Sequence, residues 1–181
     1  MNEENLWNKA LEISRTAKLK GALLPLLTET FITQNKLFND FEVRTLISSL
    51  PKHLIKKKPN FNPFDPWDKS LEIRNIGPRH TLILNKYPVQ TGHMLLITNK
   101  FMPQNGWLNI SDFEALVKVD CDTTGLWFFN SDKESGASQP HRHIQLLRRS
   151  KTEIISPRYN FLKNINDINK NNYPYFKFNR Y

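Results

Sequence analysis

Residues 130–145 read Asn-Ser-Asp-Lys-Glu-Ser-Gly-Ala-Ser-Gln-Pro-His-Arg-His-Ile-Gln, and this stretch decides both the fold and the chemistry. An apolar, aromatic segment, 125–129, precedes it and is predicted to be a buried strand. After a turn of small residues, His141, His143 and Gln145 follow at alternate positions. On a strand this spacing places the three side chains on one face and the two intervening side chains on the other.

The turn and the two histidines together favour nucleotidyl transfer. Ser135, Gly136, Ala137 and Ser138 are small, so we expect their backbone N–H groups to be accessible to a phosphate. Imidazole attacks phosphorus and can leave again, so a histidine can carry a nucleotidyl group covalently. A carboxamide such as Gln145 forms hydrogen bonds but delivers no proton at neutral pH.

Two other interpretations of the histidine pair stay open. Imidazole is a common zinc ligand, so His-x-His is compatible with a metal site. The two rings could also be structural histidines with satisfied hydrogen bonds. Cys121 is the single cysteine, which excludes an internal disulfide and a multi-cysteine zinc site. We favour nucleotidyl chemistry with no protein-bound metal.

The flanking sequence predicts an α+β fold with an antiparallel sheet of about five or more strands and a few helices. Helical spacing predicts a helix over residues 6–20, closed by Gly21. Period-two or continuous apolar patterns predict further strands over residues 41–47, 71–76, 80–85, 93–98 and 144–147. The prolines of residues 62–67 exclude regular structure there, and the aromatic side chains favour an ordered loop.

A second helix is predicted to begin at Ser111. Ser111 and Glu114 have the spacing of a capping box, and Phe113, Leu116 and Val117 supply an apolar stripe for burial. Trp127 is expected to lie in the core.

Composition limits the class of protein. The 181 residues are 39% hydrophobic and 24% charged, a balance typical of a globular domain. The net charge of +9 favours anionic ligands. The acidic start lacks an apolar signal-peptide core, and no apolar run is long enough for a membrane span, so we expect a cytoplasmic protein. We predict one domain over residues 1–181, in which 151–181 form an irregular tail rich in asparagine and aromatic residues.

The motif resembles a known family. His141 to Leu147 is similar to the histidine-triad superfamily motif in its transferase form, with Gln145 where the hydrolases carry a third histidine. Phe128 to Asn130 and Glu134 to His141 resemble the diadenosine tetraphosphate phosphorylases, also called ATP adenylyltransferases. Segments 84–89 and 92–98 are similar to the paired strands of that family.

The resemblance implies a role for each site residue. His143 would attack an α-phosphorus and hold AMP, His141 would position the ring and the phosphate, and Gln145 would bond the phosphate or the bridging oxygen. His93 would be either a partner of the triad or a core histidine. The remaining nucleotide- and phosphate-binding candidates are Asn85, Asn130, Ser135, Gly136, Ala137, Ser138, Gln139 and Lys58.

The implied reaction is phosphorolysis of a dinucleoside polyphosphate, which gives ATP and ADP from the tetraphosphate. The partners would be that substrate, ATP, ADP and inorganic phosphate. No cofactor is required, although Mg²⁺ could arrive with the nucleotide. A membrane partner is not expected, nucleic acid is disfavoured, and a homodimer is compatible with the sequence. Family members carry a further C-terminal region, whereas only residues 150–181 follow Arg149 here, so we expect part of the acceptor site to be absent or to lie on another polypeptide.

Two alternatives compete with this function. A histidine-triad hydrolase would act on a nucleoside phosphoramidate or a dinucleotide, and Gln145 argues against it. A non-catalytic nucleotide or nucleic-acid binder is favoured by the basic charge but lacks an RNA-binding signature with interleaved aromatic residues.

Overall fold

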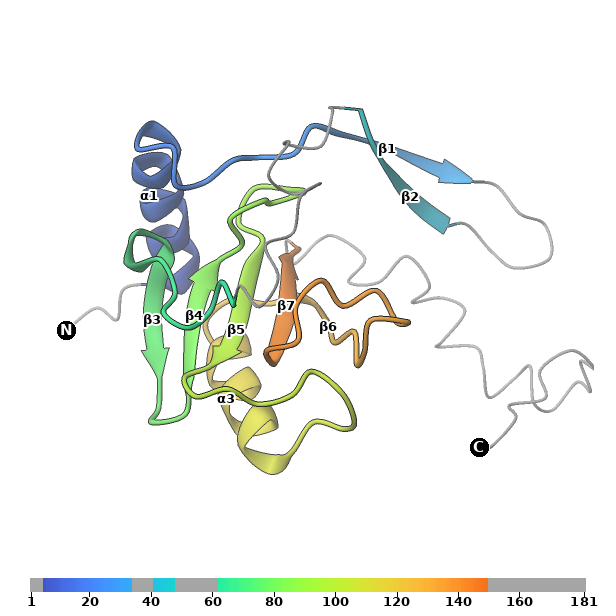
Figure 1. The fold of residues 1–181 in the computed structure, drawn as a ribbon. Coiled ribbons are helices and arrows are strands. Elements are labelled where there is room, and N and C mark those ends of the chain that lie inside the picture. The colour runs from blue at the N-terminus through green and yellow to red at the C-terminus, as the bar shows by residue number, and fades with distance from the viewer. Residues whose placement is uncertain (1–4, 34–40, 48–61, 150–181) are drawn as a thin grey trace, which may run out of the picture.

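The computed structural model describes residues 5–33, 41–47 and 62–149, and within them the chain forms two sheets and two α-helices (Figure 1). The larger sheet has five antiparallel strands in the order β3-β4-β5-β7-β6. Its strands are β3 (Glu72–Ile76), β4 (His80–Leu84), β5 (Met94–Thr98), β6 (Gly125–Phe128) and β7 (His143–Arg148). The α+β prediction is confirmed, including the strands expected near residues 71–76, 80–85, 93–98 and 144–147.

Helix α1 (Leu6–Leu19) covers one face of this sheet. Asn5 caps its start by accepting a hydrogen bond from the Trp7 N–H at 2.9 Å, and Gly21, with φ of 69°, follows its end. A φ in this range suits glycine, which has no Cβ to clash. The buried positions Leu6, Ala10, Ser14 and Ala17 form a single stripe. The helix predicted over residues 6–20 is confirmed.

Helix α3 (Ile110–Asp120) corrects the sequence prediction. Its cap is Asn109, which accepts from the Asp112 N–H while the Asp112 carboxylate accepts from the Asn109 N–H. The expected box at Ser111 and Glu114 was therefore wrong by two residues. The helix buries Asp112, Ala115 and Val119, so it presents to the sheet a different face from the one that the apolar pattern indicated.

Two of the three side chains that form the predicted apolar stripe on α3 face solvent. Phe113 is 53% exposed and Val117 is 56% exposed, whereas Leu116 packs partly against the core. The Asp112 carboxylate points inward because His80 on β4 and Arg142, just before β7, both bind it, at 2.8 and 2.9 Å. A buried ion pair with Arg142 and a buried hydrogen bond with His80 thus fix the rotation of the helix.

Two apolar clusters lie on opposite faces of the five-stranded sheet. The larger cluster joins α1 and α3 to the side chains of Leu82, Leu84, Met94, Leu96, Ile144 and Leu146. The smaller cluster contains Phe64, Ile83, Leu95 and Ile97, with Trp67 packed against it. The loop over residues 62–67 is therefore ordered, as predicted, and it covers the face opposite the helices.

Strand β6 forms an edge of the sheet, which corrects another expectation. Gly125 is buried, but Leu126, Trp127 and Phe128 are only partly buried. Trp127 packs against the larger cluster while its Nε1–H donates to Asp120 Oδ1 at 2.9 Å. An edge strand has one neighbour, so its side chains remain half open to solvent.

A two-stranded sheet, β1 (Thr28–Thr33) with β2 (Phe41–Leu46), stands beside the five-stranded sheet (Figure 1). The sequence predicted β2 but not β1. Thr28 Oγ1 and Arg44 Nη1 both donate to the Val89 carbonyl, at 3.1 and 3.0 Å, and so fasten this hairpin to the loop between β4 and β5. No helix in the described ranges has the length and hydropathy of a membrane span.

Candidate active site

His141 is held on both of its ring nitrogens. The Asn62 amide oxygen accepts from the Phe64 N–H, so its Nδ2 donates to His141 Nδ1 at 3.0 Å. The opposite nitrogen, Nε2–H, donates to the Thr98 carbonyl at 2.8 Å. Burial lowers the pKa of His141, although the bond to Thr98 opposes this shift. The ring is fully buried, neutral and fixed, so it is suited to supporting its neighbours rather than to attacking a substrate.

The His143 ring differs from that of His141 because only one of its nitrogens is hydrogen-bonded to a described residue. Its Nδ1–H donates to the His141 carbonyl at 2.8 Å, so Nε2 carries the lone pair. Nε2 forms no hydrogen bond to any residue in the described part of the chain. Burial lowers the pKa of His143 and the neighbouring His141 ring adds to the shift, while the bond to the His141 carbonyl opposes it. The ring is therefore neutral at pH 7, with one nitrogen able to act as a nucleophile.

The His143 ring is closed in by an aromatic side chain. It is 3% exposed, and the Phe64 ring centroid lies 5.3 Å from its own. His143 does not line either of two hollows found among the described residues, of about 290 and 390 Å³. The sequence predicted the imidazoles next to an accessible anion-binding turn, whereas in the structure the His143 ring is almost completely buried.

Gln145 is the third member of the motif and lies on the same sheet face. Its Oε1 accepts from His93 Nε2–H at 3.1 Å. His93 Nδ1 lies 3.3 Å from the Asn85 Nδ2, and Asn85 Oδ1 accepts from the Tyr87 N–H, so the Asn85 amide nitrogen is the donor. These bonds form a directed chain from Asn85 through His93 to Gln145. The sequence left open whether His93 contacts the motif or lies in the core as a structural histidine. In the structure its ring is hydrogen-bonded to Gln145 of the motif.

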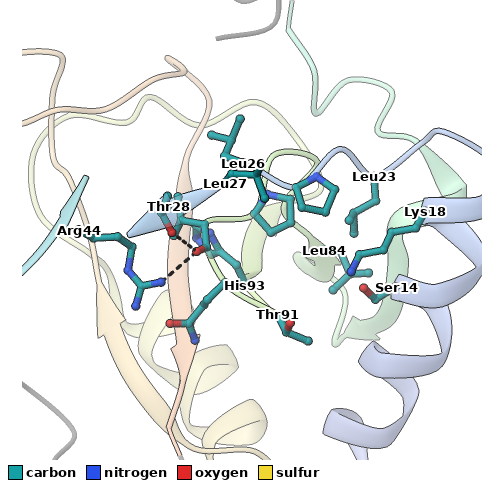
Figure 2. A pocket seen from close by; sticks show the side chains of 15 residues that line it. Ser14, Lys18, Leu23, Leu26, Leu27, Thr28, Arg44, Leu84, Thr91 and His93 are labelled. Atoms are coloured by element: carbon teal, nitrogen blue, oxygen red, sulfur yellow. Dashed lines mark hydrogen bonds between the residues drawn. The ribbon is translucent and has the colours of Figure 1, made fainter. Parts of the chain in front are cut away.

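His93 is neutral at physiological pH. Burial lowers its pKa to about 4, the hydrogen bond to Gln145 opposes the shift, and electrostatic interactions with Arg44 and His143 add to it. His93 also lines a hollow of about 290 Å³ between α1, the loop before β1 and the loop between β4 and β5 (Figure 2). Lys18, Ser14 and Arg44 line the same hollow.

The small-residue turn differs from the anion cradle that the sequence indicated. The N–H groups of Ser135 and Ala137 donate to the Asp132 carbonyl, at 3.1 and 2.9 Å, and the Gly136 N–H donates to the Lys133 carbonyl at 2.9 Å. These three donors are therefore used within the turn. Asn130 Nδ2 donates to the Gly136 carbonyl at 3.3 Å and so braces the turn from the end of β6.

The second hollow, of about 390 Å³, lies between this turn and the loop after β5. Ala137, Ser138 and Gln139 line one side of it, and Phe101 and Gln104 line the other. Lys58, the remaining predicted phosphate ligand, lies outside the described residues. The structure thus brings His141, His143, Gln145, His93 and Asn85 together. It places Ala137, Ser138 and Gln139 on a second hollow, which Asn130, Ser135 and Gly136 do not line.

The buried polar cluster of Asp112, Arg142 and His80, which lies behind the motif, was not apparent in the sequence. Arg142 extends to the helix side of the sheet, where Nη1 donates to Asp112 Oδ2 at 2.9 Å and Nε donates to the Pro103 carbonyl at 3.1 Å. His80 Nε2 contacts the other oxygen of Asp112. Among the described residues, no group of three or more His, Cys, Asp or Glu side chains is arranged to hold a metal ion.

The chain belongs to the family described as Ap4A phosphorylase N-terminal domain, which matches residues 1–157. Two proteins of Saccharomyces cerevisiae are similar to it. One, diadenosine 5',5'''-P1,P4-tetraphosphate phosphorylase 2, is 29% identical over 171 residues, which cover 82% of this chain and 51% of the relative. The other, Protein APA1, is 32% identical over 120 residues, which cover 57% of this chain and 37% of the relative.

Solved structures of the yeast Ap4A phosphorylase Apa2 have the same fold. The complex with AMP superposes with a TM-score of 0.69 at 29% identity and covers 85% of this chain and 52% of that protein. The complex with Ap4A gives a TM-score of 0.68 at 26% identity and covers 99% of this chain and 61% of that protein. This chain therefore spans about half the length of the relatives that it matches.

Proposed function

We propose that this chain catalyses nucleotidyl transfer through a covalent His143–AMP intermediate, in the phosphorolysis of diadenosine tetraphosphate to ATP and ADP. The observation that carries the proposal is the hydrogen bond from His143 Nδ1–H to the His141 carbonyl, because it leaves the lone pair on Nε2. The family membership and the AMP and Ap4A complexes of yeast Apa2 support the choice of substrate.

The first step forms one bond and breaks one bond. The Nε2 lone pair attacks the α-phosphorus, an N–P bond forms, and the bond from that phosphorus to the bridging oxygen breaks. ATP leaves with the electron pair. The lowered pKa of His143 keeps the nucleophile unprotonated at neutral pH.

The second step reverses the attack with a different oxygen. An oxygen of inorganic phosphate attacks the phosphorus of the adduct, the N–P bond breaks, and ADP forms. His143 returns to the neutral ring that began the cycle. Any Mg²⁺ would enter with the polyphosphate and screen its charge.

The remaining residues of the motif position the reactants. His93 holds Gln145 Oε1, so the Gln145 amide nitrogen is available to donate to a phosphate oxygen. His141 supports the His143 ring through its carbonyl, and Asn85 lies at the end of β4, where a nucleoside can contact it. Asn130, Ser135, Ser138 and Gln139 would contact phosphates through their side chains, with Lys58 as a further cation. Gly136 and Ala137 would do so only if their N–H groups left their bonds within the turn.

Incubation with labelled diadenosine tetraphosphate tests the proposal. The full chain should form an acid-labile, base-stable adduct that is absent in His143→Gly, and inorganic phosphate should discharge the adduct as ADP. If AMP is released equally fast without phosphate, the chain is a histidine-triad hydrolase instead. If nucleotide binds without any adduct, it is a binding protein.

A further inference from the structure

Gln104 is a buried side chain that contacts the backbone of His143 on both of its polar groups. It lies in the loop after β5 and is 4% exposed. Its Oε1 accepts from the His143 N–H at 2.8 Å, and its Nε2 donates to the His143 carbonyl at 3.1 Å. The same Nε2 donates to the Asn130 carbonyl at 2.8 Å.

The register of the sheet shows why the amide stands there. Phe128 on β6 is opposite Gln145 on β7, so two further residues would place Asn130 opposite His143. In an antiparallel ladder every second opposite pair exchanges backbone hydrogen bonds, and the His143 N–H and carbonyl both point toward the side on which Asn130 lies. Here the Gln104 amide stands between His143 and Asn130 and takes the place of a peptide group. The two strands separate at this point, where the turn over residues 131–139 begins.

Gln104 therefore fixes both ends of the segment that carries the turn and the nucleophile. Its own backbone N–H donates to the Pro140 carbonyl at 2.9 Å, which adds a third anchor. A carboxamide suits this position because its oxygen accepts from the His143 N–H and its NH₂ group donates to the carbonyls of His143 and Asn130. A carboxylate would set an oxygen against both carbonyls, and a thioether would leave all three backbone groups without their partner.

We propose that Gln104 is a positioning residue for His143, which it holds in line for attack and at a set distance from the turn. This inference rests on the proposed function of His143. The proposed role differs from a general contribution to folding, because two of the three hydrogen bonds of the Gln104 side chain go to the residue that would react. A displacement of about 1 Å at a reacting group can cost about a hundredfold in rate.

The test compares Gln104→Met and Gln104→Glu with Gln90→Met. Gln90 is a matched control because its Nε2 donates to one backbone carbonyl, that of Arg148, at the other end of β7. Three quantities are measured on the full chain: the single-turnover rate of adduct formation, the Kd for diadenosine tetraphosphate, and hydrogen exchange of the His143 N–H. Gln104→Asn, which keeps the amide on a shorter stem, replaces any variant that does not fold.

We expect Gln104→Met to slow adduct formation about tenfold to a hundredfold, to leave the Kd within about threefold, and to speed exchange of the His143 N–H. Gln104→Glu should be slower still, and Gln90→Met should stay within about threefold of the wild type. Unchanged exchange at His143, or equal losses in rate and affinity in the Gln104 and Gln90 variants, would overturn the inference. If the wild type forms no adduct, the proposed function fails, and the exchange measurement still decides whether Gln104 holds His143.

Discussion

The His93 Nε2–H donates to Gln145 Oε1 at 3.1 Å, and this bond decides which end of the Gln145 amide is left to face a substrate. With the oxygen occupied, the amide nitrogen is the end that has no hydrogen-bond partner among the described residues. We predict that His93→Phe, which keeps the ring shape but removes the donor, slows adduct formation about threefold to tenfold, the value of one net hydrogen bond. In a Gln145→Ala background the same change should have no further effect. Additive losses in the double variant would show that His93 acts through another group.

Stability should fall as the pH is lowered through the histidine range. The pKa of His93 is about 4 in the folded chain, against about 6.5 in the unfolded chain. Between these values the unfolded state binds the extra proton, so stability is full above pH 6.5 and declines as the pH falls toward 4, by roughly 3 kcal/mol from this group. Urea unfolding at pH 7 and pH 4.5 measures the decline. His93→Gln should reduce it; an identical decline in that variant would assign it to other groups.

The aromatic cover over His143 should control access to the nucleophile. Phe64 is buried, and its ring lies against both His141 and His143. We predict that Phe64→Leu raises the rate at which diethyl pyrocarbonate modifies His143 Nε2 by several-fold, because the smaller side chain leaves a gap. Phe113→Leu, on the exposed face of α3, is the control and should leave that rate unchanged. Equal rates in the two variants would mean that Phe64 does not limit access.

The buried carboxylate beneath the motif should be essential to stability. Asp112 pairs with both Arg142 and His80, and all three side chains are almost fully buried. Asp112→Asn leaves the Arg142 charge without its counterion, so we expect a loss of about 3 kcal/mol or more in urea unfolding. Glu114→Gln, at an exposed position of the same helix, should change stability by less than about 0.5 kcal/mol. Similar values for both variants would refute the structural role of the pair.

The sequence predicted elements whose signals are local. Helix α1 and strands β3, β4 and β5 follow from apolar periods within each segment, and the alternate spacing of His141, His143 and Gln145 places them on one face. Strand β1 was missed because Glu29, Thr30 and Phe31 are exposed, so no buried apolar pattern marks it, and its register comes from pairing with β2. The burial of α3 was misread because the partners of Asp112 lie 32 and 30 residues away.

The contacts that complete the site are also distant in sequence. Gln104 lies 39 residues before His143, and its role depends on a gap in a strand pairing that no local pattern reveals. His93 lies 52 residues before Gln145. The turn looked open because its residues are small, whereas its N–H groups bond to carbonyls three to five residues earlier. Small side chains therefore indicated exposure but not the hydrogen bonding of the backbone.

The nitrogen that bears AMP tests the central claim most directly. Protein with ¹⁵N-labelled histidine is mixed with diadenosine tetraphosphate, and the adduct is examined for coupling between phosphorus and ring nitrogen by NMR. We predict that the phosphorus couples to Nε2 of His143, while Nδ1 keeps its proton and its bond to the His141 carbonyl. Coupling to Nδ1, to a ring of His141 or His93, or to no histidine at all would contradict it.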